Sequence, residues 1–153
     1  MANKISRRDF IKKSAFGIIA GGTVLSSLDL AAIAANSTRG NFTKRDGDVI
    51  INLKDAKNSD LAKVDGAIFL DDDDMLVRVS QTKFVALSLI CKHKGCTVEL
   101  EGNKFVCPCH GSEYAIDGRV TEGPSKKNLD TYETIYNPEK GTVTVKMDKK
   151  IQS

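Results

Sequence analysis

The sequence predicts an all-β domain that follows an N-terminal helical segment. Two observations support this prediction. Residues 49–153 contain many short runs of β-branched and aliphatic residues, and turn residues separate these runs. No long amphipathic helical pattern follows residue 35. This length is sufficient for one domain with one core.

Residues 1–35 are predicted to be a targeting segment. The stretch 6–12 resembles a twin-arginine export motif, an apolar stretch follows at 15–28, and residues 32–34 are typical of a cleavage site. A membrane-spanning helix needs about 20 apolar residues, which this segment reaches only if it includes Asp29. Cleavage and retention as a membrane anchor are both open at this point.

The net charge of +3 comes entirely from the targeting segment. Residues 1–35 contain five basic and two acidic residues, which leaves 18 basic and 18 acidic residues in 36–153. No basic stripe with interleaved aromatic residues is present. The sequence therefore predicts no nucleic-acid partner.

Residues 36–48 are polar and contain glycine, and we expect them to form a linker or hinge. Four consecutive acids at 71–74 indicate a solvated hairpin tip, with a calcium site as the alternative. A tight turn at 102–103 should form a hairpin. The expected strands are 49–53, 67–70, 75–80, 83–90, 97–101, 104–107, 114–116, 119–121, 129–136 and 142–147.

All four Cys and both His of the chain lie between residues 91 and 110. They form two short motifs, C-K-H-K-G-C at 91–96 and C-P-C-H-G-S at 107–112, and the predicted hairpin brings these together. A site with two Cys and two His would leave one Cys in each motif. Thiolate and imidazole are ligands of zinc and of iron–sulfur centres. A zinc site and two plain disulfides are the alternatives.

These two motifs resemble those of the Rieske [2Fe–2S] proteins, and the resemblance covers about residues 91–124. It implies an antiparallel β-sandwich with a small cluster-binding subdomain, so that 49–153 would be a Rieske domain. In that family two Cys hold one iron and two His hold the other. The resemblance implies four metal ligands, Cys91, His93, Cys107 and His110, and one disulfide, Cys96 with Cys109.

Residues beside the ligands also match the family. Ser112 and Tyr114 occupy positions whose hydroxyl groups donate to cluster sulfur atoms, which indicates the high-potential branch. Gly95 and Gly111 are expected where a Cβ atom would clash with the cluster. The pair 123–124 matches the start of the loop that covers the cluster.

The resemblance implies one-electron transfer as the iron–sulfur subunit of a quinol-oxidising cytochrome bc-type respiratory complex. The expected partners are cytochrome b and cytochrome c-type subunits, with His110 as the contact for quinol and its proton. Such a subunit would be exported to the periplasmic face of a bacterial cytoplasmic membrane and anchored there by residues 1–35.

Lys94 departs from the family pattern, because quinol-oxidising complexes usually have Leu after the first ligand His. A cationic tip suits an acidic or polar partner surface. The alternative is therefore an exported electron relay, such as the small subunit of an arsenite-oxidase-type molybdoenzyme or a stand-alone carrier. A zinc-stabilised binding module is a third class. A complete Rieske oxygenase is excluded, because no His remains for its second iron site.

Overall fold

The computed structural model describes residues 38–151. The predicted targeting and anchor segment, residues 1–35, lies outside the described residues. Within 38–151, no helix has the length and apolar character needed to cross a membrane.

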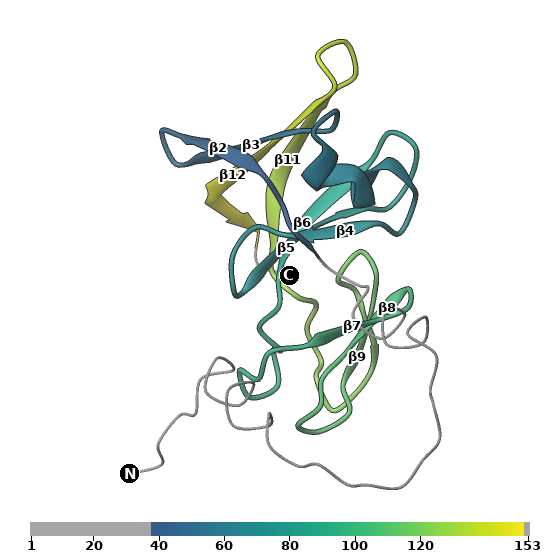
Figure 1. Ribbon diagram of the computed structural model, residues 1–153. Coiled ribbons are helices and arrows are strands. Elements are labelled where there is room, and N and C mark those ends of the chain that lie inside the picture. Colours follow the sequence, from purple (N-terminus) through teal and green to yellow (C-terminus); the bar gives the residue numbers. More distant parts are fainter. Residues whose placement is uncertain (1–37, 152–153) are drawn as a thin grey trace, which may run out of the picture. The chain divides into compact units, whose positions relative to one another are not determined.

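Eight strands form the larger of two sheets (Figure 1). All neighbouring strands are antiparallel except β1 and β4, which are parallel. Across the sheet, the strands are β1 (Thr38–Arg39), β4 (Ala67–Phe69), β5 (Asp74–Arg78), β6 (Phe84–Ser88), β11 (Thr131–Asn137), β12 (Thr142–Ile151), β3 (Asp48–Asn52) and β2 (Phe42–Arg45).

Four short strands form the smaller, antiparallel sheet. Across it lie β10 (Val120–Glu122), β9 (Glu113–Ala115), β8 (Lys104–Val106) and β7 (Glu99–Glu101). A turn at Gly102, where φ is +63°, joins β7 to β8, and Glu99 pairs with Val106 at the open end of this hairpin. The hairpin therefore brings the segments before β7 and after β8 together, as the sequence predicted.

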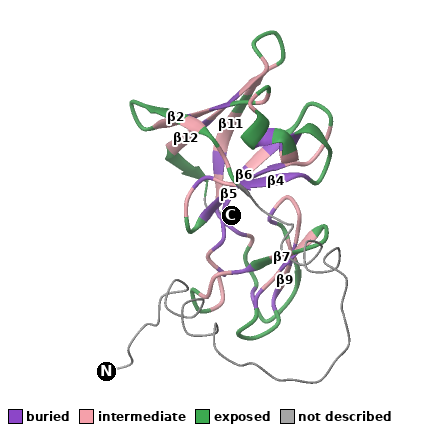
Figure 2. Cartoon of the chain, in the orientation of Figure 1, coloured by how far each residue is buried: buried purple, intermediate pink, exposed green. Residues whose placement is uncertain are grey.

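Two hydrophobic clusters use opposite faces of the central strands of the large sheet. Leu76 and Ala86 belong to the first cluster, which draws side chains from β3, β4, β5, β6, β11 and β12. Met75, Val77 and Leu87 belong to the second cluster, which reaches into the small sheet. Strand β5 is consequently buried on both faces, as its continuous apolar run indicates (Figure 2). The fold is thus the predicted all-β arrangement of antiparallel sheets.

The second cluster connects the two sheets with the candidate site. It contains Phe105 and Tyr114 from the small sheet, Leu129 from the connection to β11, and the thiols Cys91 and Cys107. The candidate site is therefore built on a packed core.

The structure differs from the expected linker at residues 36–48, because β1 and β2 lie within it. The buried side chain of Asn58 explains this order. It accepts a hydrogen bond from the Asn41 N–H at 2.8 Å, and it donates to the carbonyl oxygens of Asn41 and Asn52, each at 2.8 Å. Asn58 lies in a 3₁₀ helix, η1 (Ala56–Ala62), which the sequence analysis did not predict.

The acidic run at 71–74 is also only partly a solvated tip. Asp72 and Asp73 are exposed, but Asp74 is buried and accepts a hydrogen bond from the Tyr132 hydroxyl at 2.8 Å. Burial raises the pKa of Asp74, although the Tyr132 hydrogen bond acts to lower it.

Candidate metal centre

Two loops of similar backbone form the site, the first cluster loop (residues 91–96) and the second cluster loop (residues 107–112). In the first, the Gly95 N–H donates to the Cys91 carbonyl oxygen at 2.9 Å. In the second, the Gly111 N–H donates to the Cys107 carbonyl oxygen, also at 2.9 Å. The two motifs therefore fold into the same kind of turn.

The backbone conformation of both loops calls for glycine, whether or not a cluster lies beside it. The φ angles of Gly95 and Gly111 are +75° and +73°, which side chains rarely adopt. Among the described residues, no atom lies within 4 Å of a Cβ built at either position. Backbone conformation, and not crowding by the protein, selects glycine here.

The cysteines divide as the resemblance implied. Cys96 and Cys109 form a disulfide, with their Cα atoms 6.5 Å apart, and this bond joins the two loops. Cys91 and Cys107 are free thiols and are almost fully buried. The sulfur atoms of Cys96, Cys107 and Cys109 lie within 4.8 Å of one another, but the disulfide occupies two of them. The thiols available to a metal are those of Cys91 and Cys107.

The two histidines come together at the same place. The ring centroids of His93 and His110 are 4.7 Å apart, and the ring planes are perpendicular. His93 Nδ1 is buried and has no hydrogen-bond partner. A buried nitrogen without a partner is costly, and metal ligation is one way to satisfy it. His110 is exposed, so a partner molecule can reach its ring.

Tyr114 places a hydroxyl group on the thiol of the first cluster loop. Its oxygen lies 3.1 Å from Cys91 Sγ and accepts a hydrogen bond from the Lys92 N–H at 3.3 Å. Because that N–H uses an acceptor position of the oxygen, the hydroxyl hydrogen is available to the sulfur. Tyr114 is fully buried, which keeps water from competing for this hydrogen bond.

Ser112 is fully buried in the second cluster loop. Its oxygen accepts a hydrogen bond from the Ser125 N–H at 3.0 Å. Ser125 follows the cis peptide bond between Gly123 and Pro124, in the segment that was expected to cover the cluster. Because the Ser112 oxygen acts as the acceptor in this bond, its own hydroxyl hydrogen remains free to donate.

The two free thiols influence each other's ionisation. Burial acts to raise the pKa of Cys91, but hydrogen bonds from the Tyr114 hydroxyl and the His93 N–H bring that pKa below its usual value. Burial raises the pKa of Cys107, and the neighbouring Cys91 raises it further, against hydrogen bonds from the Cys109 and His110 N–H groups. The two thiols therefore titrate as a coupled pair, because a negative charge on one opposes ionisation of the other.

Residues 51–133 match the family model described as the Rieske [2Fe–2S] domain, which is more than half of the 153-residue chain. The chain belongs to the Rieske [2Fe–2S] family. It is 30% identical over 139 residues to the cytochrome b6-f complex iron–sulfur subunit of Microcystis aeruginosa, and this alignment covers 82% of the chain and 76% of that protein.

Two further relatives match over different lengths. The chloroplastic cytochrome b6-f complex iron–sulfur subunit of Bigelowiella natans is 53% identical over 45 residues, which are 28% of this chain and only 18% of that protein. The crystal structure of the plasma membrane Rieske protein PetC3 from Synechocystis PCC 6803 is 26% identical and has a TM-score of 0.44. It covers 78% of this chain and 93% of that chain.

The cofactor of this Rieske domain is a [2Fe–2S] cluster, and the residues at the site fit it. The fit rests on two buried free thiols, two adjacent imidazole rings and the unpaired Nδ1 of His93. The chain is thus an iron–sulfur electron-transfer protein related to cytochrome b6-f Rieske subunits.

Ser125, Lys92 and Asp130 have roles near this site that were not predicted from the sequence. Asp130 is buried, with only 5% of its surface exposed, and its carboxylate contacts Lys92 of the first cluster loop. No local pattern marks either contact, because each joins residues that are far apart in the sequence.

Proposed function

We propose that this Rieske protein transfers single electrons as the iron–sulfur subunit of a quinol-oxidising cytochrome bc-type respiratory complex. The observation that carries this proposal is the pair of histidines. The buried Nδ1 of His93 has no hydrogen-bond partner in the described structure, while the adjacent His110 ring is exposed. One end of the site is thus closed, and the other is open to a partner.

Within this proposal, Cys91 and Cys107 would hold the inner iron, and His93 and His110 would hold the outer iron. A bound cluster supplies the uptake and release of one electron. The buried Tyr114 and Ser112 hydroxyl groups would donate to sulfur and so favour the reduced state. The exposed His110 ring would accept a hydrogen bond from quinol and then its proton. The name of the Microcystis relative supports a cytochrome b partner.

The proposed location is the periplasmic face of a bacterial cytoplasmic membrane. Twin-arginine export by residues 1–35 suits a protein that receives its cluster in the cytoplasm, because that route carries folded proteins. The same residues would remain as the membrane anchor. The disulfide between Cys96 and Cys109 is consistent with an oxidising compartment.

Lys94 supports a second candidate function, an exported relay to a partner other than cytochrome b. Its side chain is exposed at the tip of the first cluster loop. A cation there suits an acidic protein surface, such as that of a molybdoenzyme or a soluble carrier.

Purification from solubilised membranes distinguishes the two candidates. The full chain with a C-terminal tag should bring b-type and c-type haem with it, seen as their absorption bands. The purified material should contain two irons per chain and give the low-average-g EPR signal of mixed Cys and His ligation when reduced. Zinc without iron would overturn the electron-transfer role, and haem-free material that holds the cluster would favour the relay.

A further inference from the structure

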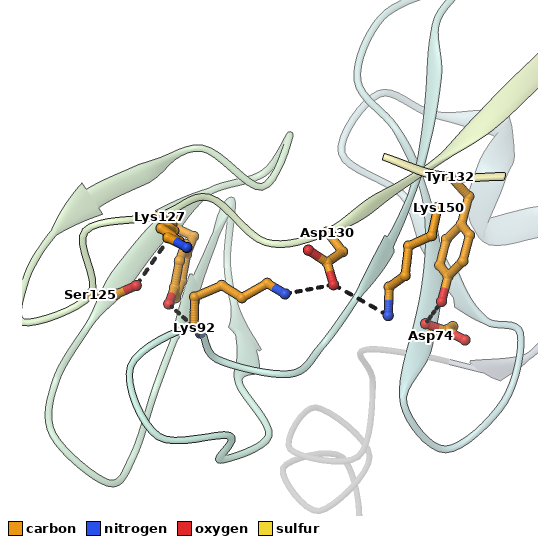
Figure 3. Close-up of polar contacts among 8 residues, drawn as sticks. Asp74, Lys92, Ser125, Lys127, Asp130, Tyr132 and Lys150 are labelled. Atoms are coloured by element: carbon orange, nitrogen blue, oxygen red, sulfur yellow. Dashed lines mark hydrogen bonds and ion pairs between the residues drawn. The ribbon is translucent and has the colours of Figure 1, made fainter. Parts of the chain in front are cut away.

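A buried ion pair connects the first cluster loop to the large sheet. Lys92 Nζ lies 2.6 Å from Asp130 Oδ2, and the side chains are 25% and 7% exposed (Figure 3). Lys150 Nζ, on β12, lies 3.3 Å from the same oxygen. Asp130 Oδ1 is buried and has no hydrogen-bond partner, so this carboxylate depends on its two lysines.

Asp130 occupies the point where the chain passes from the small sheet to the large one. The preceding residue, Leu129, donates its N–H to the Gly118 carbonyl oxygen beside the small sheet, at 2.9 Å. The carbonyl oxygen of Asp130 accepts from the N–H of Ser88, the last residue of β6, at 2.8 Å. The backbone of Asp130 is thus held in place by a hydrogen bond that does not depend on the contact between its side chain and Lys92.

Polar contacts extend from this carboxylate into the large sheet. Lys150 Nζ lies 5.6 Å from the centre of the Tyr132 ring, and the Tyr132 hydroxyl donates to Asp74. Burial acts to raise the pKa of Asp130, but the hydrogen bonds and charges of Lys92 and Lys150 outweigh it and leave that pKa below its usual value. The carboxylate is therefore ionised at neutral pH and can pair with both lysines.

Lys92 is also bound at its backbone, because its N–H donates to the Tyr114 oxygen that contacts Cys91 Sγ. We propose that the Lys92–Asp130 ion pair is a positioning device that clamps the first cluster loop to the large sheet and so keeps the Tyr114 hydroxyl on the Cys91 sulfur. The proposal rests on Cys91 as a cluster ligand. It does not depend on which partner supplies the electron.

A charge effect on the cluster makes a different prediction from a positioning effect. Loss of the Lys92 cation lowers the reduction potential by charge alone, whereas loss of the Asp130 anion raises it. Positioning predicts that both losses lower the potential, because each weakens a hydrogen bond that favours the reduced state. The sign of the shift in the Asp130 variant therefore separates the two explanations.

The test uses the full, cluster-loaded chain with Lys92→Met and Asp130→Leu, and Lys150→Met as the matched control. Lys150 contacts the same Asp130 oxygen but lies on β12, away from the cluster loops. Hydrogen exchange at the Cys91 and Gly95 amides should become on the order of tenfold faster in the first two variants and stay unchanged in the control. The amides of Cys107 and Gly111 should not change.

Redox titration on the same samples completes the test. Lys92→Met and Asp130→Leu should each lower the potential, and Lys92→Arg should restore it. The shift that Lys92→Met causes should be smaller in a Tyr114→Phe background, where only the loss of its charge still acts. A raised potential in Asp130→Leu, a full shift in the Tyr114→Phe background, or unchanged exchange in the first cluster loop would each overturn the proposal. If one variant does not fold, the other still gives both readouts.

Discussion

The first and second cluster loops share a backbone turn but have different surroundings. In each, a glycine N–H closes the turn on the carbonyl oxygen of a free cysteine. The Cys91 N–H donates to the Cys96 carbonyl oxygen and the Cys107 N–H to that of Ser112, at 2.8 Å in both cases. At the level of the backbone, the two loops are near repeats of each other.

The side chains give the two loops different access to solvent. In the first cluster loop, Lys92 reaches back to buried Asp130, and Tyr114 covers the Cys91 sulfur. In the second, Pro108 and His110 are exposed, although Ser112 below them is buried. The second cluster loop is therefore the more exposed of the two, although Lys94 of the first cluster loop is exposed as well. Asp130 and Tyr114, which lie outside the two motifs, contribute to this difference.

Loss of either free thiol should have the largest effect and should be equal in the two loops. Cys91→Ser and Cys107→Ser each remove one of the two thiolates available to the cluster. We expect the iron content of the purified protein to fall to near zero in both, with loss of the visible absorption bands. If either variant still binds two irons, the assignment of that cysteine as a ligand is wrong.

Removal of the disulfide should have the next largest effect, because it joins the two loops. The bond closes a loop with a sequence separation of 13 residues. Combined Cys96→Ser and Cys109→Ser should lower the free energy of unfolding of the cluster-free protein by about 3 kcal/mol, as measured by urea denaturation. The cluster also bridges the loops, so the loss should be smaller in the loaded protein. An equal loss in both forms would contradict this interpretation.

The ligand loops could be predicted from the sequence because their information is local. All four cysteines and both histidines lie within 91–110, and a single hairpin at Gly102 brings the two motifs together. The disulfide followed from the family pattern, and it is confirmed. Strand β5 was likewise predicted within two residues of its bounds, whereas β12 begins where predicted but continues to Ile151, beyond the expected end at residue 147.

The features that escaped prediction depend on contacts between distant segments. The strands within residues 38–45 depend on hydrogen bonds from Asn58, which lies outside them. Strand β1, which pairs in parallel with β4, has only two residues and is too short to show a periodic pattern in the sequence. Asp74 and Asp130 look like ordinary surface acids in the sequence. Each is buried because a partner from another element, Tyr132 or Lys92, is placed against it.

The two hydroxyl groups test whether the loops contribute equally to the reduction potential. A hydrogen bond to a charged acceptor contributes roughly 1.5–3 kcal/mol, which corresponds to about 60–130 mV for one electron. Tyr114→Phe and Ser112→Ala should each lower the potential by tens of millivolts or more in a redox titration. Wild-type potentials in both variants would remove the support for a high-potential cluster.

Ser112→Ala should lower stability more than Tyr114→Phe, because the N–H that loses its acceptor is buried at Ser125 and only partly buried at Lys92. It leaves the Ser125 N–H buried without its acceptor, at a cost of about 1–3 kcal/mol. Thermal unfolding of the loaded protein should therefore shift more for Ser112→Ala. Equal shifts would indicate that Ser125 finds another acceptor.

Substitution of Lys94 should have the smallest effect on the stability and spectra of the protein, and it tests which kind of partner surface contacts the first cluster loop. Its side chain is exposed and makes no ion pair in the described structure, so Lys94→Gln should leave stability and EPR unchanged. If the partner surface is acidic, the rate of electron transfer to it should fall by about fivefold or less at low salt, and its salt dependence should weaken.

If the partner is an apolar quinol pocket, Lys94→Leu should instead raise the rate of quinol-dependent reduction. Lys83→Gln, an exposed lysine between β5 and β6, is the matched control and should change neither rate. Stopped-flow measurements at several salt concentrations therefore decide which kind of surface meets the exposed loop.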